Sequence, residues 1–269
     1  MVSGMSLRYF VGYSLLFLAR LLRKVFAQVS RAVSLLEQFA LIVWTSSEID
    51  RYSRDDWNSW LSVQGYARMD HWLATEQALV EKYLSKNGEL LNLACGAGRE
   101  ALLLARSGLR VTACDRSPRM VAEARRRAQE AHLPVRLAVA DLLDDLPYPE
   151  KAFDYLFLTN IALSYIFPKW RRVRFLRQAH SVLRPGGLFI ISFMRARGDP
   201  RIPAGPSEWL FMGLRRWAPF NREYEPGDRF EGTFTHFFRS EELANEFQEA
   251  RFLVKEWLWD EGYAVLVKL

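Results

Sequence analysis

From residue 89 onward the chain alternates short apolar, β-branched runs with longer runs in which apolar residues recur every three or four positions. The short runs predict strands and the longer runs predict helices. Strands are expected near 89–94, 109–114, 134–140, 152–159 and 187–193, and helices near 98–107, 117–131 and 169–183. This alternation favours an α/β fold, in which helices cover both faces of a mostly parallel sheet.

Two β-rich runs, RFLVKEWLW and YAVLVKL, end the chain and are separated only by Asp260, Glu261 and Gly262. Because so short a connection joins antiparallel strands, the last strand is expected to run antiparallel to its neighbour. Ahead of the first strand, residues 48–88 predict two short helices, the second over Thr75–Leu84.

The N-terminal residues 1–47 form a separate basic and apolar segment. Apolar residues recur at helical spacing between Leu7 and Val43, which predicts one helix or a helical pair. The apolar run Tyr9–Leu22 contains Arg20 and is shorter than the roughly 20 residues that a membrane span needs. Residues 1–44 carry five Arg and Lys residues against Glu37, which accounts for +4 of the net charge of +6. Such a stripe suits a protein surface or a lipid surface, and both alternatives remain open.

Composition excludes several classes of protein. With 50% hydrophobic and 25% charged residues, the chain is able to bury a core and is not mainly disordered. Cys95 and Cys114 are the two cysteines, and the sequence has neither a disulfide framework nor a zinc-binding spacing. We therefore expect a cytoplasmic protein without a metal site. The alternative is a cytoplasmic protein that contacts a membrane surface through residues 1–44. The basic run Lys169–Arg174 is interpreted as the solvated face of a helix, and no nucleic-acid partner is expected.

A glycine turn follows the first predicted strand, in LLNLACGAGREALLLARSG. Glycine permits a tight turn and a close approach to a ligand, and the helix that follows presents free N–H groups. Gly96, Gly98 and Ala101 also match the G-x-G-x-x-A pattern of dinucleotide-binding proteins. The turn therefore indicates a nucleotide-like ligand without identifying it.

Acidic residues end the next two predicted strands. Asp115 follows LRVTAC, and a carboxylate at that position is able to accept hydrogen bonds from both hydroxyls of a ribose. Its alternative role is the N-cap of the helix that begins at Ser117 and Pro118. Asp141 ends the third strand, near the position expected for an adenine amine. Met120 and Leu142 are expected to cover the faces of that adenine. Both nicotinamide cofactors and S-adenosylmethionine (SAM) contain these groups.

In combination, the turn ACGAGRE, the acids Asp115 and Asp141, and the segment LRPGGLFIISF resemble the class I SAM-dependent methyltransferases, particularly the small-molecule group. The resemblance is close over about 89–193 and extends in outline to 269. It implies a Rossmann-like, doubly wound, seven-stranded sheet with an antiparallel last strand. Residues 89–269 would form the SAM-binding domain, residues 48–88 cap helices, and residues 1–47 a helical extension.

The resemblance also implies the residues that bind SAM, the expected cofactor. These are Asn92, Ala94, Gly96, Gly98, Asp115, Arg116, Met120, Asp141, Leu142 and Asn160. Most members of the family have an acidic residue at the position of Asn92, where it helps to hold the methionine amine. Asn92 supplies no charge, and the backbone carbonyl of Ala94 is an alternative partner for the amine.

The expected reaction is methyl transfer to oxygen or nitrogen of a small-molecule or lipid-like acceptor. An insertion at about 195–235, rich in Trp, Phe and Arg, is expected to form either a lid over the acceptor or a helical pair at the edge of the sheet. Acceptor contacts are assigned to Tyr66, Tyr165, Trp209 and Tyr224, and His236 is the candidate general base, with a structural histidine as its alternative. Two other functions remain open, an NAD(P)-binding oxidoreductase and a non-catalytic SAM-binding subunit.

Overall fold

The computed structural model describes residues 32–33, 36–37, 41, 43–198, 213 and 223–269. Most of the N-terminal extension and of the expected lid, Trp209 included, lies outside the described residues, so the predictions made for these segments stay predictions. Within the described ranges, no helix has the length and apolar character needed to cross a membrane.

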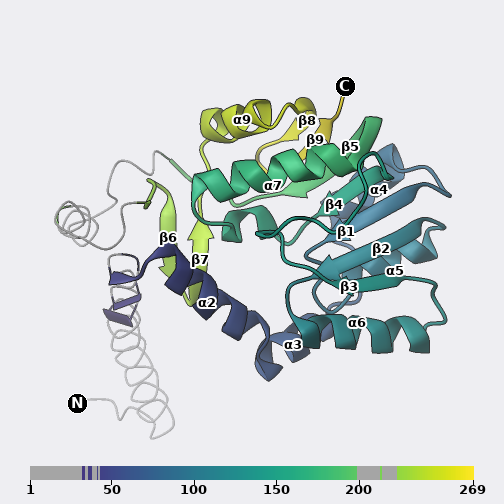
Figure 1. Ribbon diagram of the computed structural model, residues 1–269, viewed down its shortest axis with the longest axis horizontal. Coiled ribbons are helices and arrows are strands. Elements are labelled where there is room, and N and C mark those ends of the chain that lie inside the picture. Colours follow the sequence, from purple (N-terminus) through teal and green to yellow (C-terminus); the bar gives the residue numbers. More distant parts are fainter. Residues whose placement is uncertain (1–31, 34–35, 38–40, 42, 199–212, 214–222) are drawn as a thin grey trace, which may run out of the picture.

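Seven strands of the described chain form one mixed sheet in the order β3-β2-β1-β4-β5-β9-β8 (Figure 1). Their bounds are β1 Glu89–Leu93, β2 Arg110–Asp115, β3 Arg136–Val139, β4 Phe153–Leu158, β5 Leu183–Ser192, β8 Leu253–Leu258 and β9 Tyr263–Val267. Strands β1 to β5 pair in parallel, and β9 lies antiparallel between β5 and β8. The α/β fold with an antiparallel last strand is thus confirmed.

Helices cover both faces of this sheet. The described helices are α2 Ser46–Trp57, α3 Trp60–Ala67, α4 Ala74–Tyr83, α5 Arg99–Arg106, α6 Pro118–Glu130, η1 Ala162–Tyr165, α7 Lys169–Val182 and α9 Ser240–Glu249. Alternate residues of β1 point to opposite faces: Leu91 packs into a cluster with Phe175 of α7, and Leu90 into one with Leu104 of α5. Both faces are therefore apolar, as the uninterrupted hydrophobic strands of the sequence require.

The structure differs from the predicted elements in two places. Three helices, α2 to α4, replace the two predicted short helices, and α2 begins with a capping box between Thr45 and Glu48. Strand β5 begins at Leu183 instead of near 187, because Arg184–Gly187 continue the strand through an irregularity opposite Phe153 and Tyr155.

A separate hairpin, β6 (Asp228–Glu231) and β7 (Thr233–His236), forms within and just after the expected lid. Its Phe230 and Phe234 pack into a small cluster with Ile49 of α2 and with Phe167. Figure 1 shows the hairpin beside α2, which it contacts through β7. The hairpin therefore packs against the cap helix α2 and also contacts η1 through β7.

Candidate active site

The glycine turn after β1 is built from backbone that favours glycine. Gly96 and Gly98 have φ values of 51° and 89°, and Gly98 is the N-cap of α5. A Cβ on Gly98 would lie 2.9 Å from the Cβ of Ala124 in α6. Gly98 thus lets α5 and α6 pack closely. It is not among the described residues that line the pocket, and its contact with the cofactor stays a prediction.

Asp115 fixes the geometry of this turn. Its Oδ2 accepts a hydrogen bond from the Gly96 amide at 2.9 Å, and its Oδ1 accepts one from the Ser117 amide at 2.8 Å. Burial raises the pKa of Asp115, while the hydrogen bonds from Ser117 and Gly96 oppose that shift. The N-cap of α6 is Ser117, whose hydroxyl accepts from the Met120 amide, so Asp115 does not cap this helix. Each oxygen of Asp115 keeps lone-pair capacity for a ligand hydroxyl.

A pocket of about 920 Å³, counting the solvent at its mouth, opens at the carboxyl ends of β1, β2 and β4. Its lining comprises Ser53, Trp57, Tyr66, Ala94, Cys95, Gly96, Ala97, Arg99, Glu100, Asp115, Arg116, Met120, Asp141, Leu142, Leu143, Asn160, Ala162, Tyr165 and Ile166. Eight of the ten predicted cofactor residues lie in this lining. The exceptions are Asn92 and Gly98.

Helix α2 closes one side of the pocket through ion pairs. Arg116 lies 2.7 Å from Asp50 of α2 and 3.1 Å from Asp141 of the pocket wall. Arg54 of α2 also lies 3.4 Å from Asp141. These contacts place Ser53 in the lining, a residue that sequence reasoning missed. The capping signal at Thr45 predicts a helix here, but it carries no information about which surface the helix covers.

Three aromatic rings form another part of the wall. The Trp57 ring centroid lies 5.6 Å from that of Tyr66 and 5.1 Å from that of Tyr165. Tyr66 and Tyr165, both predicted as acceptor contacts, therefore lie around Trp57, which the sequence analysis did not single out. Burial raises the pKa of both phenols, so they stay neutral and are able to donate hydrogen bonds.

Sequence reasoning also missed a buried ion group at the start of α5. Arg99 contacts both carboxylate oxygens of Glu76 at 2.8 Å and contacts Glu100 at 2.6 Å. Glu100 also accepts hydrogen bonds from the Thr159 hydroxyl at 2.9 Å and from the Asn160 amide at 3.3 Å. Burial raises the pKa of Glu100, and Arg99 opposes the shift. The available signal was a charged Arg-Glu pair directly after the glycine turn.

Asn92 is 1% exposed and is not among the described pocket residues, so its contact with the cofactor stays a prediction. Its Nδ2 donates to the Phe157 carbonyl of the neighbouring strand at 3.2 Å, and its Oδ1 has no partner within the described chain. The Asn92 amide thus links β1 to β4 inside the sheet.

We expect Asn92→Asp to destabilise the fold at pH 7. A carboxylate cannot donate to the Phe157 carbonyl, which would leave two buried acceptors facing each other. The loss is expected to be about 1–3 kcal/mol in the free energy of unfolding, measured by urea titration. A variant as stable as the wild type would show that this hydrogen bond does not matter.

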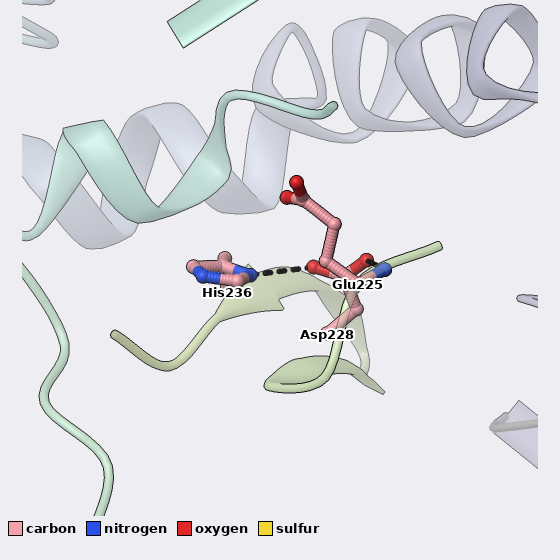
Figure 2. A group of neighbouring side chains, drawn as sticks. All are labelled: Glu225, Asp228 and His236. Carbon is pink, nitrogen blue, oxygen red and sulfur yellow. Dashed lines mark hydrogen bonds and ion pairs between the residues drawn. The ribbon is translucent and has the colours of Figure 1, made fainter. Parts of the chain in front are cut away.

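His236 fits its alternative role as a structural histidine, because it is fully buried and is not among the described residues of the pocket. Its Nδ1 lies 2.7 Å from Asp228 and its Nε2 lies 3.0 Å from Glu242 (Figure 2 shows the first contact). Two carboxylate partners require both ring nitrogens to donate, so the imidazole carries a positive charge. It therefore has no lone pair for a proton from an acceptor and serves as a structural histidine.

The other predicted acceptor residue near this hairpin, Tyr224, also lies away from the pocket. Its hydroxyl donates to the Asp228 carbonyl at 3.0 Å, and its ring packs against the cluster of Phe230 and Phe234. Tyr224 is not among the described residues of the pocket lining. Its described contacts support the hairpin instead.

Arg172 connects this histidine to a larger buried network. It is fully buried and contacts Glu225 at 2.7 Å and Glu246 at 2.8 Å. This corrects the interpretation of Lys169–Arg174 as a solvated helix face, because Arg172 points inward from α7. The residue pattern of a single sequence cannot distinguish an arginine that forms ion pairs in the interior from one that faces solvent.

Glu225, Asp228 and His236 lie close enough to hold a metal ion, with ligand atoms within 4.8 Å of one another. However, both nitrogens of His236 are bonded to carboxylates, and the Glu225 carboxylate contacts Arg172. Figure 2 shows that this carboxylate points away from the His236–Asp228 pair. The cluster is therefore explained as an ion-pair network.

The network predicts a pH-dependent stability. Burial and Arg172 lower the pKa of His236, but the hydrogen bonds with Asp228 and Glu242 outweigh them, and the net shift is upward. The stabilisation is thus fully present below the unfolded histidine pKa of about 6.5 and is lost as pH rises through the raised native value. The Tm difference between wild type and His236→Gln should therefore shrink from pH 6 to pH 9 by thermal scanning. A difference that grows with pH would contradict the charged imidazole.

Comparisons with known proteins agree with this geometry. Residues 90–187 match the family model of a methyltransferase domain. An uncharacterised methyltransferase of Synechocystis sp. is 31% identical over 159 residues, which cover 59% of this chain and 63% of that protein. A carboxy-S-adenosyl-L-methionine synthase of Yersinia pestis is 32% identical over 137 residues, 49% of this chain and 48% of that protein. The chain thus spans less than two thirds of the length of these relatives.

Solved structures show the same fold. A SAM-dependent methyltransferase of Methanosarcina mazei superposes with a TM-score of 0.55 at 19% identity and covers 74% of this chain and 99% of that one. The family match spans the strands and loops that build the pocket, from β1 into β5. Residues 90–187 therefore match a methyltransferase domain, and the sheet has the fold of the SAM-dependent methyltransferases.

Proposed function

We propose that this chain transfers a methyl group from SAM to oxygen or nitrogen of a small-molecule or lipid-like acceptor. The pocket geometry supports SAM as the ligand. Asp115 offers two carboxylate oxygens to a ribose, Met120 and Leu142 offer apolar surface to adenine, and the Gly96 turn leaves room for the amino-acid portion. The observation that carries the proposal is Asp115, which two amides hold at the end of β2, in the part of the pocket that lies within the family match.

Positioning is the main catalytic contribution that these residues make. A bound sulfonium supplies a methyl carbon that is already electrophilic, so the acceptor lone pair needs alignment with the carbon–sulfur bond more than it needs a strong base. Holding two reactants at attack distance contributes up to about 7–11 kcal/mol in favourable models. The rings of Trp57, Tyr66 and Tyr165 are placed to exclude water and to orient an apolar or aromatic acceptor. Among the described lining residues there is no histidine, which supports transfer without a histidine base.

Labelled SAM tests the reaction directly. The purified chain is incubated with a cell extract and SAM carrying an isotopically labelled methyl group, and metabolites are compared by mass spectrometry with and without the protein. We expect one acceptor to gain the labelled methyl group. A mass gain on SAM itself would instead indicate chemistry like that in the name of the Yersinia relative. No labelled acceptor, despite tight SAM binding, would favour the non-catalytic alternative.

The N-terminal segment bears on the acceptor class, and its membrane contact remains a proposal. We expect the full chain to sediment with anionic vesicles, because residues 1–44 carry +4 of the net charge on an apolar helical pattern. Deletion of residues 1–44 should abolish sedimentation. Equal binding by the truncated chain would contradict a lipid-facing role for this segment.

A further inference from the structure

Glu100 occupies an unusual electrostatic position in the pocket wall. It is 3% exposed, and it shares a single arginine, Arg99, with the fully buried Glu76. Arg99 contacts both oxygens of Glu76 but approaches Glu100 through one nitrogen only. These three buried side chains therefore carry one negative charge in excess, and buried charge without a partner is costly.

The hydrogen bonds locate this excess on the pocket side. Arg99, Thr159 and Asn160 all donate to Oε1 of Glu100. No other described side chain donates a hydrogen bond to Oε2, and the backbone amide of Glu100 also stabilises the carboxylate. Glu100 lines the pocket, whereas Glu76 does not. One carboxylate oxygen is thus left for a cation that enters the pocket.

Glu100 also lies next to the part of the pocket that is expected to hold the amino-acid portion of SAM. It lies in the first turn of α5, directly after the Gly96–Gly98 bend, while Asp115 holds the other side of the same bend. Asn92, at the position where the family has an acid, is uncharged and bonded within the sheet. Glu100 therefore supplies a carboxylate to this part of the pocket, whereas Asn92 supplies no charge.

We propose that Glu100 replaces the missing strand acid and binds the ammonium group of the methionine portion of SAM, an inference that rests on the proposed function. Thr159 and Asn160 then act as positioning residues, because their hydrogen bonds hold Oε1 and turn Oε2 toward the ligand.

Calorimetric titration with two ligands tests this contact. S-Adenosylhomocysteine has the ammonium group, whereas 5′-methylthioadenosine has the same nucleoside and sulfur without the amino-acid portion. Glu100→Gln keeps the side-chain shape and removes the charge. It should therefore weaken the binding of S-adenosylhomocysteine about 10- to 100-fold, the range expected for a hydrogen bond to a charged group. Binding of 5′-methylthioadenosine should change less than about threefold, within the scatter expected of an uncharged contact.

Glu76→Gln is the matched control, because it removes the same charge from the same ion group away from the pocket. It should change the ratio of the two affinities by less than about threefold. The proposal would be overturned if Glu76→Gln lowered the ratio of S-adenosylhomocysteine affinity to 5′-methylthioadenosine affinity as much as Glu100→Gln does. It would also be overturned if Glu100→Gln weakened binding of both ligands equally. If wild-type chain binds neither ligand, the proposed function fails as well.

A ligand-side measurement covers the case in which Glu100→Gln does not fold. The desamino analogue of S-adenosylhomocysteine keeps the carboxylate and lacks only the ammonium group. Wild-type chain should bind it at least about tenfold more weakly than S-adenosylhomocysteine. Equal affinity for the two would overturn the role of Glu100.

Discussion

Asp115→Ala is expected to weaken binding of S-adenosylhomocysteine about 100-fold or more, measured by calorimetry. The substitution removes both carboxylate oxygens assigned to the ribose, and a hydrogen bond to a charged group contributes about 1.5–3 kcal/mol. It also releases the Gly96 amide, so the glycine turn loses the contact that fixes it against β2. The two effects act in the same direction on affinity.

Asp154→Ala is the control for this substitution. Asp154 lies at the start of β4, at the opposite edge of the same sheet, where it pairs with Arg184 at 2.6 Å. Its removal should leave affinity within about twofold of wild type. Comparable losses in both variants would indicate that the sheet was disturbed and would contradict a ribose contact at Asp115.

Arg172→Met is expected to lower the free energy of unfolding by about 3–5 kcal/mol, measured by urea titration. The arginine is fully buried and contacts Glu225 and Glu246, with the His236 pairs close by. Methionine fills much of the same volume but leaves these carboxylates without their cation. Because the network joins α7, α9 and the β6–β7 hairpin, the loss should be accompanied by weaker attachment of the hairpin.

Arg174→Met provides the comparison on the same helix. Arg174 is exposed and pairs with Asp145, whose side chain is 89% exposed. Exposed pairs contribute about 0–1 kcal/mol, so this variant should remain near wild-type stability. A similar loss at both positions would contradict the assignment of a special buried network to Arg172.

Local patterns were sufficient to predict most of the sheet and of the ligand-binding edge. Asp115 ends β2 and Asp141 follows the end of β3. The carboxyl ends of parallel strands meet at one edge of a sheet, so the topology alone places both acids there. The glycine turn was readable because tight turns and close helix packing require glycine at particular positions. These signals depend on residues near each other in sequence or on regular strand geometry.

Features that depend on long-range packing were not readable. Trp57 reaches the pocket because ion pairs from Asp50 and Arg54 hold α2 across it, and no local pattern encodes that placement. The burial of Arg172 and His236 depends on partners more than 50 residues away or on the β6–β7 hairpin. The hydrogen bond from the Asn92 amide to the Phe157 carbonyl also joins residues far apart in the sequence, so no local pattern shows it.

The most direct test is a crystal structure of the chain with S-adenosylhomocysteine. We predict that the ribose hydroxyls lie within hydrogen-bond distance of the Asp115 carboxylate, that adenine contacts Met120 and Leu142, and that the amino-acid portion lies over the Gly96 turn. A nucleoside bound elsewhere on the molecule, or this pocket closed to S-adenosylhomocysteine and occupied by NADH, would contradict the account.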